Sequence, residues 1–300
     1  MSGKRERRKR QVLIHKITIA VIAIAIIALF AYRFIEKGMG TDNNETSGSK
    51  TTTSQEELKE SINDDQASNQ ASNQASNQES LTVEERKDII REQASQKAYP
   101  DEVFWLLDNN LETVSFVENY EEKKDVAPAA DIGVDYEQGT IPKLYQYDER
   151  WGYTIYGGSM LARTGCGPTA LSMVLIYVKN DPTITPNVVA EYSQANGFVE
   201  AEHGTQWQLM TNAAANWGVN ISEGSPTDEE WVGKTLSAGK PIICSMGPGD
   251  FTTSGHFIVL TKYEDGQVYL HDPFRASNTE RVWTYAEIAP QIKAMWAYSQ

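Results

Sequence analysis

The sequence predicts an α+β domain over residues 140–300, with helices first and an antiparallel sheet after them. Helical apolar spacing and short apolar runs between turn residues predict helices near 168–179, 186–195, 206–217, 228–238 and 284–292, and strands near 241–246, 256–263, 267–271 and 294–299. Thr227 is the expected N-cap of the fourth helix and Gly239 its stop. A segment of about 160 residues is long enough to bury one substantial core.

Residues 82–130 are expected to form a helical collar that packs on this domain. Thr82 and Glu85 have the capping-box spacing at the start of a charged helix, and a second helix is expected from Pro100. A separate binding module is the alternative interpretation of the collar.

The first 81 residues are predicted to anchor and extend the protein outside a cell membrane. Residues 1–16 form a basic tail, and the uncharged Ile- and Ala-rich run within 17–35 is long enough for a transmembrane helix. The positive-inside rule then places the tail in the cytoplasm and the rest outside. A cleaved signal peptide is the alternative. Residues 36–81 are rich in Ser, Asn and Gln, with a tandem Ala-Ser-Asn-Gln repeat, and are expected to be a disordered linker.

The charge distribution argues against a nucleic-acid partner. The chain has a net charge of −14, and residues 1–16 carry +6, which leaves −20 (−14 minus +6) on the remainder. An acidic body repels nucleic-acid phosphates and anionic lipid surfaces, so membrane contact is expected through the N-terminal helix alone. No Asp-x-Asp-x-Asp-Gly calcium loop is present, and no cofactor is expected.

Cys166 is the candidate nucleophile. It lies between Gly165 and Gly167, and Pro168 and an apolar helical pattern follow it. The N-terminus of a helix favours an anion, and the thiolate is the nucleophilic form of cysteine. The two glycines are expected to leave room for a substrate backbone. A small buried structural cysteine is the alternative, and an exported chain leaves a disulfide between Cys166 and Cys244 open.

His256 and Asp272 are candidates to activate that thiol, because a nucleophilic cysteine needs a base and a group that orients the base. If residues 264–266 form a three-residue hairpin loop, Asp272 lies opposite Ile258, on the face that His256 shares. His271 then points to the other face and is expected to be structural. Each residue alone could equally be a satisfied structural residue at a strand end. Zinc accepts the same ligand types, but no second Cys or His lies at close spacing, so no metal site is expected.

Four motifs in order resemble the C39-like peptidases of the papain-like superfamily: Gln146–Gly152, Gly165–Ala170, Gly255–Leu260 and His271–Pro273. The resemblance covers roughly residues 140–300 and implies a papain-like cysteine peptidase fold. It implies Cys166 as the nucleophile, His256 as general base and acid, and Asp272 as the residue that orients His256. Gln146 would help the Cys166 amide to stabilise the oxyanion. Its alternative role is to fix the turn at 148–151.

The resemblance extends to Gly204-Thr205-Gln206-Trp207. Gly165, Gly167, Gly255 and Trp207 are therefore candidates to line a substrate cleft, although tryptophans of this kind also pack in cores. Residues 99–124 resemble a helical stretch that precedes such domains in Gram-positive bacterial surface proteins.

These expectations describe an extracellular, single-pass membrane-anchored cysteine peptidase or amidase of a Gram-positive bacterium. Its substrate would be a secreted peptide or the peptide part of the cell wall. One alternative is a non-catalytic papain-fold surface module that binds a peptide or cell-wall ligand. The other is an acyltransferase, in which an amine replaces water at the same thioester.

Overall fold

The computed structural model describes residues 81–200 and 204–300. The chain divides into two units, Met1–Ala71 and Ser72–Gln300, and all of the described residues belong to the second. The predicted basic tail, transmembrane helix and nearly the whole linker lie outside the described residues. Within the described ranges, no helix combines the length and apolar character needed to cross a bilayer.

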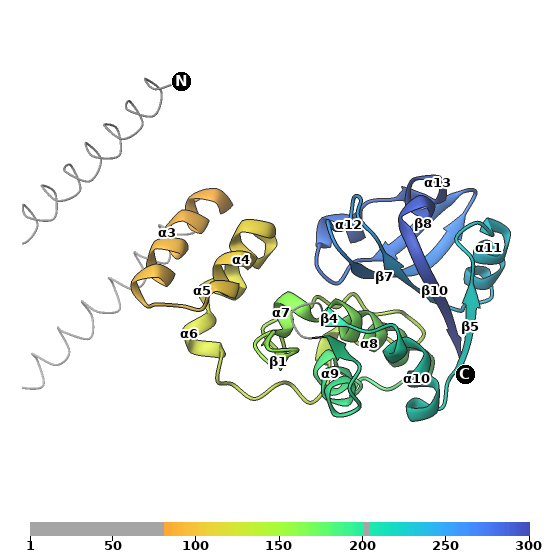
Figure 1. The fold of residues 1–300 in the computed structure, drawn as a ribbon, viewed down its shortest axis with the longest axis horizontal. Helices are drawn as coiled ribbons and strands as arrows, with labels where there is room; N and C mark the ends of the chain where they lie inside the picture. The colour runs from red at the N-terminus through yellow and green to blue at the C-terminus, as the bar shows by residue number, and fades with distance from the viewer. Residues whose placement is uncertain (1–80, 201–203) are drawn as a thin grey trace, which may run out of the picture. The chain divides into compact units, whose positions relative to one another are not determined.

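The described residues form a mixed helix and sheet fold, as predicted, in which most helices precede the main sheet (Figure 1). The α-helices are α3 (Val83–Gln96), α4 (Asp101–Asn109), α5 (Val114–Glu118), α6 (Tyr120–Lys123), α7 (Leu161–Thr164), α8 (Cys166–Lys179), α9 (Pro186–Ala195), α10 (Gln208–Trp217), α11 (Glu229–Ser237), α12 (Ala276–Glu280) and α13 (Tyr285–Ile288). Short 3-10 helices are Leu111–Thr113, Gly133–Asp135 and Ala289–Gln291.

The main sheet contains six antiparallel strands in the order β5-β10-β6-β7-β8-β9. Their bounds are β5 (Asn220–Gly224), β6 (Ile242–Met246), β7 (His256–Glu264), β8 (Gln267–His271), β9 (Trp283–Thr284) and β10 (Ile292–Ser299). Two short hairpins accompany the sheet, formed by β1 (Ile155–Tyr156) with β2 (Ser159–Met160) and by β3 (Val199–Glu200) with β4 (Gly204–Thr205).

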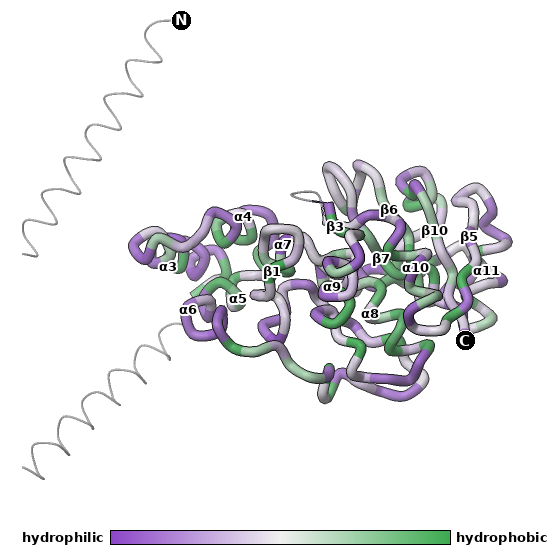
Figure 2. Tube along the Cα trace, turned by 60° about the horizontal axis from the view of Figure 1, so that its bottom comes forward, coloured by the Kyte–Doolittle hydropathy of each residue, from purple (hydrophilic) through white to green (hydrophobic). Residues whose placement is uncertain are grey.

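The central strands are buried on both faces. Ile243 and Val259 pack with the apolar residues of α8 on one face, whereas their neighbours Cys244 and Ile258 pack with Val232 of α11 on the other. Successive side chains of a strand point to opposite faces, so an unbroken apolar run is what a strand between two helical layers requires. Figure 2 shows the hydrophobic residues of α8 in the interior and mainly hydrophilic ones along α3.

Most of the predicted elements are confirmed to within two residues. The fourth helix shows one correction: its N-cap is Asp228 rather than Thr227, because the Asp228 carboxylate accepts the N–H of Trp231 at 2.9 Å. Gly239 ends the helix with a φ of +73°, as expected of a glycine after a helix. The edge strand β5 was not predicted, because its sequence, Asn-Ile-Ser-Glu-Gly, has too few apolar residues to show a strand pattern.

The hairpin between β7 and β8 differs from the prediction in its turn and matches it in its register. Glu264 pairs with Gln267, so the loop has two residues, both with positive φ, instead of three. An irregularity between Leu260 and Lys262 then shifts the register by one residue, and Val259 pairs with His271. The next pair in that register joins Ile258 and Asp272, because the shift compensates for the shorter loop.

The collar helices share an apolar core with the domain that follows them. Leu106, Leu107 and Phe116 of the collar pack with Tyr153 and Ala162 in one buried cluster. The rings of Phe116 and Tyr153 stack with their centroids 4.0 Å apart. The predicted capping box at the start of α3 is confirmed. A core completed by residues from both segments explains why the collar packs on this domain.

Candidate active site

Cys166 is the first residue of α8, which confirms its predicted place at a helix N-terminus. Its side chain is partly exposed, whereas Cys244 in β6 is fully buried, and both cysteines are free. The disulfide that the sequence left open is therefore absent. The first amides of a helix have no partner within it, so they can face an anion at this position.

Gly165 and Gly167 accommodate packing rather than a substrate, which corrects the reason given for them from the sequence. A Cβ on Gly165 would lie 2.5 Å from the Leu161 carbonyl oxygen, and one on Gly167 would lie 2.5 Å from the Thr205 hydroxyl oxygen. Neither glycine lines the cavity beside Cys166, whereas Gly255 does. The glycines allow the turn before α8 and the strand β4 to approach the cysteine closely.

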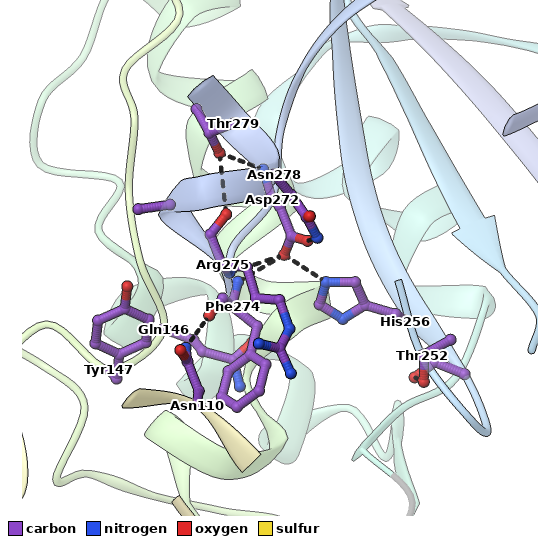
Figure 3. A network of polar contacts seen from close by, with 12 residues as sticks. Asn110, Gln146, Tyr147, Thr252, His256, Asp272, Phe274, Arg275, Asn278 and Thr279 are labelled. Atoms are coloured by element: carbon purple, nitrogen blue, oxygen red, sulfur yellow. Dashed lines mark hydrogen bonds and ion pairs between the residues drawn. The ribbon is translucent and has the colours of Figure 1, made fainter. Parts of the chain in front are cut away.

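His256 and Asp272 meet at the end of the sheet where β7 begins and β8 ends (Figure 3). His256 Nε2 lies 2.7 Å from Asp272 Oδ1, and both side chains are buried. Burial disfavours the charged imidazole, but the Asp272 charge and hydrogen bond, with a further hydrogen bond to the Cys166 side chain, raise the pKa of His256 to about 10. Because Nε2 bonds to Asp272, Nδ1 is the ring nitrogen that remains for the thiol.

Asp272 is held by a set of donors that follow it closely in the chain. Its Oδ1 accepts the N–H groups of Phe274 at 2.8 Å and Arg275 at 3.2 Å, and its Oδ2 accepts Asn278 Nδ2 at 2.7 Å. Burial acts to raise its pKa, yet the His256 charge and these hydrogen bonds hold the pKa below its usual value. The carboxylate therefore stays charged and keeps the imidazole oriented.

Gln146 ties together the segments that carry Cys166 and Asp272. Its backbone N–H donates to the Pro273 carbonyl at 2.8 Å, and its side-chain Nε2 donates to the Ala162 carbonyl at 2.8 Å. The turn at 148–151 is held by its own backbone and by Arg150, without the Gln146 side chain. Among the described residues, the buried Gln146 Oε1 has no hydrogen-bond partner and Nε2 has no second acceptor.

One cavity of about 730 Å³ contains the side chains of this site. Its walls include Cys166, His256, Gln146, the loop from Gly249 to Gly255, and residues of α4, α7 and the segment after Asp272. The residue types predicted for a nucleophile, a base and an oxyanion donor therefore share one concave space, which is the arrangement expected of a cysteine active site.

A family model described as "Peptidase_C39 like family" matches residues 139–300, which includes every side chain of this cavity apart from those of α4. The chain belongs to this family. The C39-like family and fold suggest cysteine peptidase activity, and the resemblance noted in the sequence is confirmed to that extent.

Two solved structures are similar to the chain. One is a putative C39-like peptidase from Bacillus anthracis, with 15% identity and a TM-score of 0.35 over 57% of this chain and 97% of that one. The other is the peptidase domain of Streptococcus ComA, a bifunctional ABC transporter involved in a quorum-sensing pathway, with 16% identity and a TM-score of 0.36 over 46% of this chain and 93% of that one. No curated protein matches the chain.

Trp207, a candidate for the substrate cleft, and His271, expected to be structural, both lie outside the cavity. The Trp207 side chain is 48% exposed and donates to the Ser245 hydroxyl at 3.0 Å, and it does not line the cavity wall that Cys166 occupies. His271 Nδ1 lies 3.1 Å from the Pro142 carbonyl oxygen. Burial lowers the pKa of His271 to about 4, so this imidazole is neutral near pH 7. It links the end of β8 to the segment around Pro142.

Two collar residues that no sequence motif marks, Asn110 and Glu112, hold the loop after Asp272. Glu112 accepts the N–H groups of Ala276 at 2.6 Å and Ser277 at 3.0 Å, and the hydroxyl of Tyr147 at 2.8 Å. Asn110 Nδ2 donates to the Phe274 carbonyl. Neither Asn110 nor Glu112 belongs to a sequence motif that would indicate this contact.

Replacing Glu112 with Gln is expected to lower the free energy of unfolding by about 1–3 kcal/mol, because one oxygen that accepts buried or partly buried donors becomes an N–H₂ group. Denaturant unfolding measures this change, and amide exchange at Phe274–Ser277 should accelerate with it. Glu122→Gln, at an exposed collar position, is the matched control. Equal stability of the two variants would contradict the role assigned to Glu112.

The two cysteines are expected to differ sharply in reactivity in the native protein. Burial raises the pKa of the Cys244 thiol and removes it from solvent, whereas Cys166 faces the cavity. Iodoacetamide should modify Cys166 alone until the protein is unfolded in denaturant, when both cysteines react. Peptide mass spectrometry after a brief exposure measures this, and native labelling of Cys244 at a comparable rate would contradict the burial described.

Proposed function

We propose that this protein is a cysteine hydrolase that cleaves a peptide amide bond through Cys166, His256 and Asp272. The observation that carries the proposal is the free Cys166 thiol at the start of α8, in one cavity with a His256 ring that Asp272 orients at 2.7 Å. A helix N-terminus and an adjacent imidazolium both stabilise a thiolate. The family match supports the same chemistry.

In the proposed reaction, the Cys166 thiolate attacks the carbonyl carbon and the C=O electron pair moves onto oxygen. The backbone amide of Cys166 and the free Nε2 hydrogen of Gln146 stabilise this oxyanion. His256 protonates the amide nitrogen, the C–N bond breaks, and the amine leaves a thioester on Cys166. His256 then takes a proton from water, whose oxygen attacks the thioester and releases the acid and the thiolate.

We propose further that the enzyme acts outside the cell, held by a transmembrane helix at 17–35 and a linker over 36–81. The basic tail, the apolar run and the polar repeat in the sequence support this location. A tether of this length would allow the catalytic domain to reach secreted peptides or the peptides of a cell wall.

The test is digestion of a peptide library in H₂¹⁸O by the full-length protein and its Cys166→Ala variant. Mass spectrometry should find new peptide ends with the wild-type protein, with ¹⁸O in each new carboxyl group, and none with the variant. New amides without ¹⁸O would instead indicate acyl transfer to an amine. Cleavage that persists in Cys166→Ala would overturn the assignment of the nucleophile, and a protein that cleaves nothing would favour a binding module.

A further inference from the structure

Two arginines lie on the wall of the cavity that holds Cys166 and His256. Arg163 belongs to α7, three residues before the cysteine, and Arg275 lies three residues after Asp272. Neither guanidinium forms an ion pair with a carboxylate among residues 81–200 and 204–300, whereas the other four arginines in these ranges, Arg86, Arg91, Arg150 and Arg281, each form one. Both arginines therefore bring a positive charge without an ion-pair partner to the cavity wall, in a chain with a net charge of −14.

The collar helix α4 holds both arginines in place. The Arg163 guanidinium carbon lies 5.3 Å from the centre of the Trp105 ring, and Arg275 Nη2 donates to the Asn109 carbonyl at 2.6 Å. Arg275 also lies 5.7 Å from the Phe274 ring centre, and the Trp105 and Phe274 rings are themselves 5.7 Å apart. An aromatic face or a carbonyl fixes a guanidinium without neutralising its charge.

The cavity wall carries little compensating negative charge, although Glu112 accepts the N–H groups of Ala276 and Ser277 beside Arg275. Among the described residues, Asp250 is the one carboxylate on this wall, and Asp272 contacts His256 without lining the cavity. Asp250 Oδ2 accepts Gln291 Nε2 at 2.7 Å rather than a guanidinium. Figure 3 shows the Arg275 side chain beside Phe274. The His256 ring lies on the same side of Asp272.

We infer that Arg163 and Arg275 form a subsite for a carboxylate of the substrate, next to the bond that Cys166 attacks. This inference rests on the proposed cysteine hydrolase function. The ligand is a peptide with an acidic side chain or a free C-terminal carboxylate close to the scissile amide. Guanidinium groups bind carboxylates with two parallel hydrogen bonds, and a partly desolvated cavity strengthens that attraction. The collar thus contributes to specificity, because α4 orients both cations.

The test compares alkylation of Cys166 by iodoacetate and by iodoacetamide. The two reagents differ only in that iodoacetate carries a carboxylate where iodoacetamide carries a neutral amide. In both reactions the thiolate sulfur bonds to the CH₂ carbon and iodide leaves. We expect the ratio of the iodoacetate rate to the iodoacetamide rate to fall about tenfold in full-length Arg163→Gln/Arg275→Gln, because a positive cavity concentrates the anionic reagent. Arg163→Lys/Arg275→Lys should retain most of the ratio, since the charge is kept.

Lys240→Gln is the matched control for charge, because Lys240 is an exposed cation remote from this cavity. If the double variant disturbs the Asp272 loop, Arg163→Gln alone, which keeps the Arg275 hydrogen bond to Asn109, should still lower the ratio. If neither Arg163→Gln nor the double variant changes the ratio of the iodoacetate rate to the iodoacetamide rate, the subsite is overturned. The proposed function of Cys166 would stand in that case. Slow, His256-independent reaction with iodoacetamide would instead overturn the proposed function.

Matched peptides distinguish the two sources of the carboxylate. A peptide acid and its C-terminal amide test a terminal carboxylate, and Asp against Asn in an otherwise identical amide tests a side chain. If the acidic peptide of one pair protects Cys166 from iodoacetamide, and the double Gln variant loses this protection, the result supports the subsite. The pair that shows the effect then tells whether the carboxylate is terminal or belongs to a side chain. Equal protection by the acidic and neutral members of both pairs would contradict it.

Discussion

Asp272→Ala is expected to lower the free energy of unfolding by about 3–5 kcal/mol, because it leaves buried partners without their acceptor. The His256 ring, two backbone N–H groups and the Asn278 amide all donate to this carboxylate. Denaturant unfolding at pH 6 measures the change. Asp125→Ala, at an exposed carboxylate of the collar, should cost less than about 1 kcal/mol.

The loss of stability in Asp272→Ala should depend on pH, because His256 and Asp272 form a charged pair only over part of the pH range. His256 has its pKa raised to about 10, so its stabilisation is complete below its unfolded value near 6.5 and is lost as the pH rises through 10. Asp272 has a lowered pKa, so its stabilisation is present above about pH 4 and is lost at lower pH. The variant should therefore lose more stability at pH 6 than at pH 10. An equal loss at both pH values would contradict a charged pair.

Gln146→Ala is expected to slow cleavage of a peptide substrate about 100-fold, the usual effect of removing one oxyanion donor. Alkylation by iodoacetamide forms no oxyanion, so it should slow much less in the same variant. The ratio of the two effects is the measurement, with the substrate taken from the peptide library. Gln146→Glu offers a second comparison, because it keeps the size of the side chain and removes the N–H donor.

The alternative role of Gln146, in fixing the turn at 148–151, predicts another outcome. In that case cleavage, alkylation and stability would all decline together, because the whole site would shift. The Gln146 side chain donates to the Ala162 carbonyl of α7 and not to the turn at 148–151, which argues against the turn role. A cleavage rate that Gln146→Ala leaves unchanged would exclude both roles.

The sequence predicted the pairing of His256 with Asp272 because strand alternation is a local rule. The hairpin loop was shorter than expected, yet an irregularity between Leu260 and Lys262 restored the register, so the pair met as predicted. Apolar periodicity likewise located α8 and the buried strands, since burial between two layers imposes that pattern. A strand such as β5, at the polar edge of the sheet, is not subject to that constraint.

The rest of the site depends on contacts between residues far apart in the chain. Asn110 and Glu112 hold the loop after Asp272 from more than 160 residues away, and nothing in their local sequence indicates a partner. Gly165 and Gly167 illustrate the same point, because a glycine beside a nucleophile can serve a substrate or a packed neighbour. Only the three-dimensional neighbours, Leu161 and Thr205, distinguish the two.

The central claim is that His256 keeps Cys166 in its nucleophilic form, and the pH dependence of iodoacetamide alkylation tests it most directly. Mass spectrometry gives the rate at Cys166 for the wild-type protein and for His256→Ala between pH 5 and 10. We predict fast wild-type labelling at pH 6 and a rate about 100-fold lower in the variant, because no imidazolium then stabilises the thiolate. Coincident profiles, both with the rise of an ordinary thiol, would contradict an activated cysteine.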